Sequence, residues 1–143
     1  MFVYEPTESE LASLRDWFTT YDALAAKGAV EEMADLAVFP MNLATDVSGG
    51  HAAVTQWNRE QYVAAMAEVM GGGTAELEMT SERTPHFLTE NLAVVVSEAT
   101  MTVGGEVQRM TYADLMVRTA DGWAFQSMIQ GGWGADWPQA KRG

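Results

Sequence analysis

Two tight turns in the C-terminal half of the chain constrain its fold more than any other feature. Gly104-Gly105 and Asp121-Gly122 are typical of two-residue β-hairpin loops, and segments of alternating apolar and polar residues flank each of them. A hairpin loop fixes the register of its two strands. The first loop pairs Val95 with Asp114 and Ser97 with Tyr112. The second predicts the pairs Ala120 with Trp123 and Asp114 with Ile129.

This register divides the sheet into an apolar and a polar face, because directly opposed residues share a face. The apolar face carries Val95, Ser97, Ala99, Met101, Met110, Tyr112, Asp114, Met116, Trp123, Phe125, Ser127 and Ile129. The polar face carries Glu98, Thr100, Thr102, Arg109, Thr111, Ala113, Gln126, Met128 and Gln130. We expect the apolar face to meet the helices, and Asp114 is the one acidic residue on it.

The remaining elements predict a single α+β domain over residues 1–143. A T-x-x-E capping box at Thr7 begins an apolar stripe of helical spacing that ends at Gly28. Further helices are predicted over 29–37 and from Asn58 to Gly71, with strands over 38–45, 74–84, 92–103, 106–118 and 123–131. Pro85 to Asn91 is predicted to be a loop. Helices first and an antiparallel meander last favour helices that cover one face of a sheet.

Asp114 is the first candidate for chemistry. Aspartate is disfavoured in the middle of a strand, and burying its charge costs free energy unless it is paired or protonated. Apolar surroundings would raise its pKa into the range where a carboxyl acts as an acid or base near neutral pH. One alternative is a structural Asp114 that is hydrogen-bonded to Tyr112, Ser97 or a helix end. The other is a register slip of one residue, which would place Asp114 on the outer face.

At this point the chain resembles the nuclear-transport-factor-2-like (NTF2-like) superfamily, which includes ketosteroid isomerases and SnoaL-like polyketide cyclases. The segment ADLMVRTADGW, residues 113–123, is similar to the penultimate strand and final turn of both enzyme groups. In them an Asp eight residues before the turn glycine is a pocket acid, as Asp114 stands before Gly122. The resemblance implies a cone in which three N-terminal helices pack in the concave face of a curved, mostly antiparallel sheet.

The same resemblance implies two further catalytic residues. Tyr21 stands seven residues before Gly28, as a tyrosine of the isomerases does, and Asp46 follows the first strand, where the isomerases place their general base. Asp46 would then remove a proton next to a carbonyl, while Tyr21 and protonated Asp114 donate to the enolate oxygen. The alternatives are a core tyrosine and a turn aspartate. The chain departs from several cyclases because its strand 93–103 has no histidine.

An apolar pocket would need further lining residues. We expect these to be Trp17, Phe18, Trp57, Tyr62, Tyr112, Met116 and Phe125, although core packing also explains aromatic and methionine side chains. His51 and His86 are isolated, with no spacing that indicates a metal site. No phosphate-binding glycine fingerprint occurs either, so we expect neither a metal nor a cofactor.

Charge and hydropathy limit the partners. Twenty acidic and eight basic side chains give a net charge of −12, which would repel a nucleic acid backbone. No apolar run approaches the length of a membrane span, and no secretory signal or cysteine is present, so we expect a cytoplasmic protein that contacts no membrane. The expected ligand is a small hydrophobic molecule.

Two functions fit these observations. The first is a cofactor-independent isomerase, cyclase or lyase that performs acid–base proton transfer on a polyketide- or terpenoid-like carbonyl compound. The second is a non-catalytic small-molecule-binding or oligomerisation module on the same fold, because a fold does not determine a function. The outer sheet face resembles the surface through which relatives pair, so we also expect a homodimer.

Overall fold

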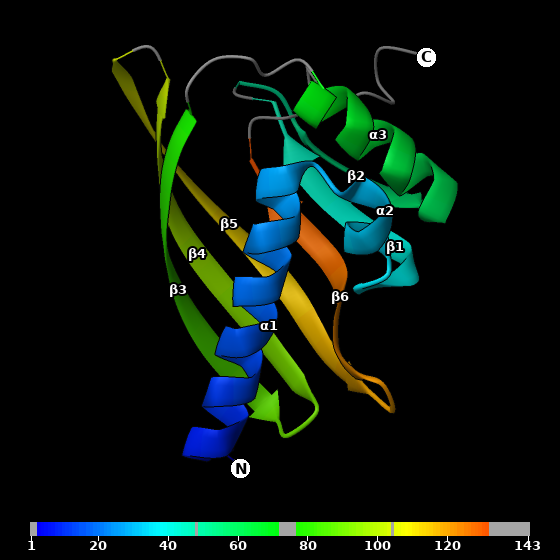
Figure 1. The fold of residues 1–143 in the computed structure, drawn as a ribbon, viewed down its shortest axis with the longest axis vertical. Coiled ribbons are helices and arrows are strands. Elements are labelled where there is room, and N and C mark those ends of the chain that lie inside the picture. Colours follow the sequence, from blue (N-terminus) through cyan, green and yellow to red (C-terminus); the bar gives the residue numbers. More distant parts are fainter. Residues whose placement is uncertain (1–2, 48, 72–76, 104, 132–143) are drawn as a thin grey trace.

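The computed structural model describes residues 3–47, 49–71, 77–103 and 105–131, and it shows an α+β fold (Figure 1). In chain order the elements are α1 (Glu8–Lys27), α2 (Val30–Ala34), β1 (Ala37–Asp46), β2 (Ala52–Trp57), α3 (Arg59–Gly71), β3 (Leu77–Thr89), β4 (Leu92–Val103), β5 (Glu106–Thr119) and β6 (Gly122–Gln130). The predictions made for residues 72–76, Gly104 and 132–143 concern positions outside the described part of the chain.

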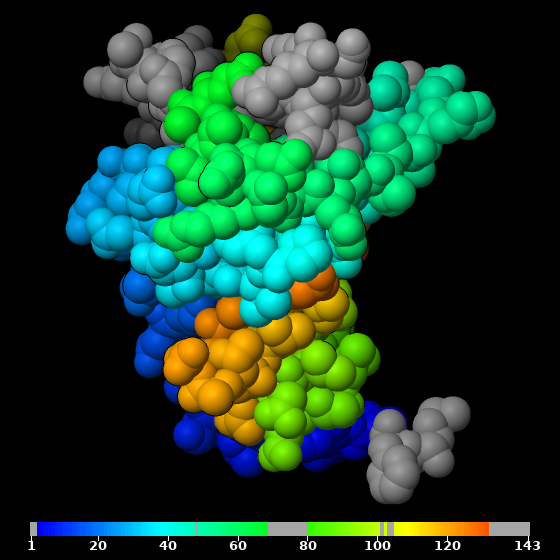
Figure 2. Space-filling view, turned by 90° about the vertical axis from the view of Figure 1, so that its right-hand side faces the viewer, coloured from blue at the N-terminus to red at the C-terminus, as the bar shows by residue number. Residues whose placement is uncertain are grey.

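The six strands form one mixed sheet in the order β2-β1-β6-β5-β4-β3. The pairs are antiparallel except that of β1 with β6, which is parallel. In Figure 1, α1 crosses in front of the long strands, whereas α2 and α3 lie near β1 and β2. Figure 2 shows the green surface of α3 above the cyan surface of β1, with the yellow and orange hairpin of β5 and β6 below.

The helices differ in part from the prediction. α2 spans five residues and stops at Ala34, because the chain enters β1 at Ala37. Only α1 and α3 are long, and α3 follows β2 in the sequence. The predicted arrangement of three N-terminal helices is therefore not confirmed.

Both long helices begin at the predicted caps. The Glu10 amide donates to Thr7 Oγ1 at 3.1 Å, and the Thr7 amide donates to Glu10 Oε1 at 2.8 Å. Asn58 and Gln61 make the same reciprocal pair at α3, at 2.8 and 2.9 Å. Gly28 ends α1 with a φ of 68°, a left-handed conformation that favours glycine.

The predicted register of β4 with β5 is confirmed, since Val95 pairs with Asp114 and Ser97 with Tyr112. The predicted register of β5 with β6 is wrong. Thr119 pairs with Gly122, so the two loop residues are Ala120 and Asp121, and the Thr119 hydroxyl accepts from the Asp121 amide at 3.1 Å. This loop begins one residue earlier than predicted.

A β-bulge at Gln126 shifts the register of β6 with β5 a second time. Gln126 has no partner between the pairs Met116 with Phe125 and Leu115 with Ser127. An unpaired residue reverses the side-chain alternation that follows it. Met128 therefore lies opposite Asp114 and Gln130 opposite Tyr112, whereas Ser127 and Ile129 lie on the outer face, the reverse of the prediction.

The predicted loop from Pro85 to Asn91 is also wrong, because β3 continues through Pro85 to Thr89. Proline lacks an amide proton and is tolerated on an edge strand. β3 is such an edge, and Pro85 pairs with Val95 of β4.

The core lies between the helices and the inner sheet face. Its largest side chains with almost no exposed surface come from both layers: Met33, Met41, Trp57, Tyr62, Val95 and Met116. None of the described helices is both long and apolar enough to cross a membrane.

The capping box generates a stability prediction. Thr7→Ala should lower the free energy of unfolding by about 1 kcal/mol, because it leaves an amide at the start of α1 without its acceptor. Urea denaturation measures the change. Thr20→Ala is the control, because the Thr20 hydroxyl donates to the Asp16 carbonyl inside the helix, at 3.2 Å, and caps nothing. Equal stability of the two variants would contradict the assigned role of the cap.

Candidate functional site

Asp114 lies in the middle of β5, on the face that meets the helices. Its neighbours in register are Val95 on β4 and Met128 on β6, so apolar side chains flank the carboxyl on both sides. Burial raises the pKa of Asp114 from 3.8 to about 7, and the positive charge of Arg83 opposes this shift. The residue as a whole is half-buried.

Two tyrosine hydroxyls lie near this carboxyl. Tyr21 of α1 and Tyr62 of α3 approach each other with a distance of 3.5 Å between their oxygen atoms. Burial raises the pKa of Tyr62 to about 12 and that of Tyr21 well above 10, and the charge of Asp114 contributes to both shifts. Both hydroxyls therefore keep their protons at neutral pH and are available as hydrogen-bond donors.

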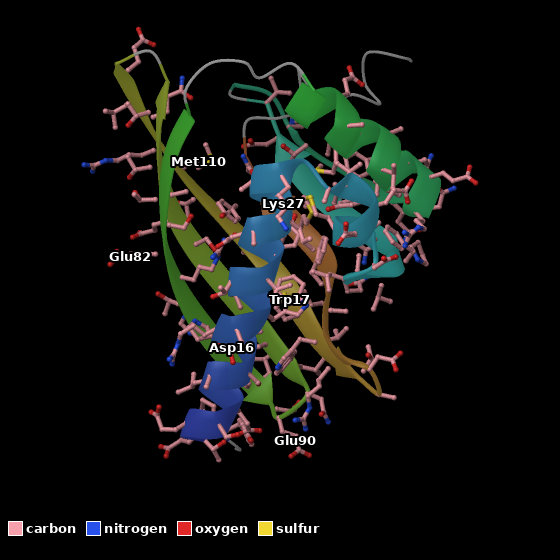
Figure 3. All side chains as sticks on the ribbon, in the orientation of Figure 1. Asp16, Trp17, Lys27, Glu82, Glu90 and Met110 are labelled. Carbon is pink, nitrogen blue, oxygen red and sulfur yellow. The ribbon has the colours of Figure 1, made fainter. Side chains whose placement is uncertain are left out.

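Aromatic rings hold the two tyrosines in place. Trp17 stacks on Tyr21 with centroids 5.3 Å apart and an interplanar angle of 9°. Phe125 of β6 contacts Trp17, Tyr21 and Tyr62 with its ring at centroid distances between 5.4 and 5.9 Å. Figure 3 shows Trp17 on the side of α1 that faces β5 and β6. The hydroxyl pair thus lies in apolar surroundings, in which a hydrogen bond to a charged group is stronger than in water.

Arg83 of β3 is a site residue that the sequence analysis missed. Its Nη1 and Nη2 donate to the two carboxylate oxygens of Asp22 at 2.7 and 2.8 Å, and its guanidinium carbon lies 4.3 Å from the centroid of the Phe18 ring. Arg83 pairs in register with Ser97, which pairs with Tyr112. The alternation of side chains along this segment was visible in the sequence, but no hairpin loop fixed the pairing of β3 with β4. The face of the sheet on which Arg83 lies could therefore not be predicted.

Three polar atoms near the site have no hydrogen-bond partner among the described residues. They are Trp17 Nε1, Arg83 Nε and Ser97 Oγ, and each is buried. A buried polar group without a partner costs about 1–3 kcal/mol and is uncommon in native proteins. Such groups are available to oxygen atoms of a bound molecule or to water.

The structure brings most of the predicted residues to this region. Tyr112 lies two residues before Asp114 on the same strand, and Met116 lies two residues after it and is fully buried. Phe18 lies below Arg83. Trp57 is fully buried too, at the end of β2 opposite Met41.

Asp46 is not brought to the cluster. In β1 the side chains of Met41, Leu43 and Thr45 are buried, whereas Asp46 belongs to the alternating exposed set. A Cβ on Gly131 would lie 3.1 Å from Asp46 Oδ1, which places this carboxylate beside the end of β6. Within the described residues, no three His, Asp or Glu side chains gather in a way that could hold a metal ion.

The geometry described above combines an acid that titrates near neutral pH with two neutral hydroxyl donors. A carboxyl with a pKa of about 7 is divided between its two protonation states at neutral pH, so it can accept or donate a proton. The tyrosine pair can stabilise a negative oxygen atom that forms beside it.

Comparisons with known proteins bear on the fold. The sequence matches no protein-family model and no curated protein. An NTF2-like protein of unknown function from Pseudomonas putida KT2440 superposes with a TM-score of 0.73 at 11% identity, over 89% of each chain.

Two similar structures carry enzyme names. A candidate scytalone dehydratase from Novosphingobium aromaticivorans has a TM-score of 0.63 at 19% identity, with 85% of this chain and 83% of that chain covered. A candidate dehydratase of the NTF2-like family from Streptomyces avermitilis has a TM-score of 0.67 at 15% identity, over 87% and 96%.

These identities are all below 25%, and the superpositions cover most of each chain. The resemblance predicted from Tyr21, Asp114 and Gly122 is confirmed at the level of the fold: the chain has the fold of the NTF2-like proteins.

Proposed function

We propose that the chain is a cofactor-independent acid–base enzyme, an isomerase, cyclase or lyase, that moves a proton on a small hydrophobic carbonyl compound. The observation that carries this proposal is the position of Asp114, whose pKa is raised to about 7 beside the hydroxyl pair of Tyr21 and Tyr62. Acids and bases with a pKa near the working pH are the most effective in proton transfer.

In the proposed reaction the ionised form of Asp114 is the base. Its carboxylate removes a proton from the carbon next to the substrate carbonyl. The electron pair of that C–H bond forms a C=C bond, and the π pair of the carbonyl moves onto its oxygen. Tyr21 and Tyr62 donate hydrogen bonds to the resulting enolate oxygen. The protonated Asp114 then returns the proton to another carbon of the enolate as the carbonyl re-forms. In the lyase form it protonates a β-hydroxyl instead: the carbonyl re-forms, the enolate double bond shifts to the β-carbon, the C–O bond there breaks and water leaves.

This assignment moves the role of base from Asp46 to Asp114. Asp46 is exposed and lies on the alternating set of β1 that faces away from the core, whereas Asp114 faces the tyrosines. The proposed donors change accordingly, because Tyr62 joins Tyr21 in place of a protonated Asp114.

The surroundings of the site support a hydrophobic substrate. In the proposal, the helices and the sheet form a cone whose apolar wall is built from the stacked Trp17 and Tyr21, from Phe125 and from the other predicted lining residues. A polyketide- or terpenoid-like carbonyl compound would suit such a wall. The dehydratase names of two structural neighbours favour the lyase form of the reaction, in which water is lost.

Asp114→Asn tests the catalytic role. Exchange of the α-protons of a hydrophobic ketone such as 2-tetralone in D2O, followed by ¹H NMR, reports on the base without requiring the natural substrate. We expect a rate that rises with pH through about 7, and a loss of roughly 100-fold or more in Asp114→Asn. Tyr21→Phe should lose roughly 10- to 100-fold.

Asp121→Asn is the matched control, because Asp121 lies in the exposed loop of the same hairpin. A full rate in Asp114→Asn would exclude this residue as the base. If the ketones bind but none exchanges its α-protons faster than in buffer, the non-catalytic binding module becomes the better account.

The raised pKa of Asp114 also predicts a pH dependence of stability. Between about pH 4 and 7 the carboxyl is ionised in the unfolded chain but protonated in the folded protein, so the folded state binds more protons. Its contribution to stability is therefore lost as the pH rises through this window.

Relative to Asp114→Asn, the free energy of unfolding of the unmodified protein should fall by up to about 1.4 kcal/mol per pH unit in this window. It should fall no further above about pH 7. Urea denaturation of both proteins at several pH values measures the difference, in which all other titrating groups cancel. A difference that does not vary with pH would show that Asp114 has an ordinary pKa.

We also propose a homodimer that forms through the outer sheet face. Val96, Ala113, Ile129, Ala44 and Val54 pair successively in register, so they form one apolar row across β4, β5, β6, β1 and β2. Val54 is 79% exposed and Ile129 48% exposed. The bulge in β6 creates this row, because it turns Ile129 outward and Met128 inward. The other three residues of the row are half-buried. A contiguous apolar patch on the outer face of a sheet is typical of a protein interface.

Ile129→Asp should convert the dimer to a monomer, because it would bury two symmetry-related charges in the interface. Light scattering coupled to size exclusion gives the mass. Val3→Asp is the control, because Val3 is 80% exposed and precedes α1, outside the sheet. A monomer of the unmodified protein at tens of micromolar would remove the proposed interface.

A further inference from the structure

A cavity lies between α1 and the edge strand β3 of the sheet. It measures about 400 Å³ and is lined by Leu11, Leu14, Arg15, Phe18, Thr19, Ser81, Arg83, Pro85 and Val95. We call it the α1–β3 groove. Ser81 and Arg83 line the groove from the same face of β3. Glu82 lies between them in the sequence and points away from α1 in Figure 3. A volume of this size is within the range of small-molecule sites.

The groove has an apolar floor. Leu14, Phe18 and Val95 are all buried, with exposed fractions of 2, 6 and 1%. Leu11 and Pro85 extend this surface along α1 and β3. A hydrocarbon or aryl group placed on it would be removed from water on one side, which favours binding in proportion to the apolar area covered.

Two arginines meet at this apolar floor. The whole chain carries only eight basic side chains against twenty acidic ones, yet Arg15 and Arg83 both line the groove. Among the described residues no acid forms an ion pair with Arg15. Asp22 already binds both Nη atoms of Arg83, while the buried Arg83 Nε has no partner in the described part of the chain. The groove therefore has one uncompensated positive charge, at Arg15.

We propose that the α1–β3 groove binds an amphipathic monocarboxylate, whose apolar body lies on Leu14, Phe18 and Val95 and whose carboxylate is bound by Arg15. A guanidinium matches a carboxylate in geometry and binds it with two parallel hydrogen bonds. A dianion such as a phosphate would need a second uncompensated cation, which Arg83 does not supply. The groove shares Phe18, Arg83 and Val95 with the surroundings of Asp114. It includes none of Asp114, Tyr21 and Tyr62, the residues that move or stabilise charge in the proposed reaction, so a ligand there goes beyond the proposed function.

Octanoate and octanamide are the probes for this site. They share an apolar chain and differ in the charge of the head group. We expect octanoate to bind at least 10-fold more tightly than octanamide in isothermal titration calorimetry at low ionic strength, because the hydrogen bond to an ionised acceptor is the stronger one. Higher salt should reduce this ratio, since Arg15 is exposed.

Two variants locate the binding. Arg15→Gln should weaken the binding of octanoate at least 10-fold and leave the affinity for octanamide unchanged. Ser81→Phe should abolish the binding of both probes, because its ring would fill the groove from the edge strand. Arg109→Gln is the charge control, since Arg109 is an exposed arginine on β5. A circular dichroism melt of each variant establishes that it is folded.

Four results would overturn the proposal. The first three are no binding of octanoate at millimolar concentration, equal affinities for octanoate and octanamide, and an Arg15→Gln variant that binds octanoate as the Arg109→Gln variant does. Binding of octanoate that Asp114→Asn abolishes and Ser81→Phe leaves intact would also overturn it, because the ligand would then occupy the Asp114 site. The α-proton exchange of ketones tests the proposed function independently of all these results.

Discussion

The backbone pairing of β4 with β5 decides which side chains meet α1. Because Val95 is fixed opposite Asp114 and Ser97 opposite Tyr112, four side chains of these strands point to the same face. A slip of one residue would place all of them on the opposite face. Asp114 would then lie on the outer face with an ordinary pKa, and the tyrosines of α1 and α3 would face residues of the other set of β5, such as Ala113 and Leu115. The candidate chemistry therefore depends on this register.

The bulge at Gln126 is the second constraint, and it serves both faces of the sheet. Without it Ile129 would lie beside Asp114 and Met128 would lie outside. With it, Met128 and Gln130 face the core, and Gln130 donates to the Met110 sulfur at 3.7 Å. Ile129 completes the apolar row of the outer face. One unpaired residue thus connects the packing around the acid with the proposed dimer interface.

Local signals in the sequence were sufficient for the features that depend on neighbouring residues. The caps at Thr7 and Asn58 and the end of α1 at Gly28 involve contacts over a few residues, and the structure has each of them. The α+β fold was implied by the resemblance to the NTF2-like superfamily that Tyr21, Asp114 and Gly122 carry.

Features that depend on distant residues could not be predicted in this way. The meeting of the Tyr21 and Tyr62 hydroxyls joins residues 41 positions apart, and the ion pair of Arg83 with Asp22 joins residues 61 positions apart. The bulge at Gln126 has no composition signal, because glutamine is not a turn residue. Asp46 was assigned from its place after a strand, but the alternation in β1 buries Thr45 and exposes Asp46.

The ion pair of Arg83 with Asp22 explains why Asp114 keeps a raised pKa although a cation lies close to it. A free guanidinium near Asp114 would favour the carboxylate and lower the pKa, whereas burial has the opposite effect. Asp22 holds both Nη atoms of Arg83, so much of the positive charge is compensated before it acts on Asp114. Burial is then the larger influence, and the pKa of Asp114 rises to about 7.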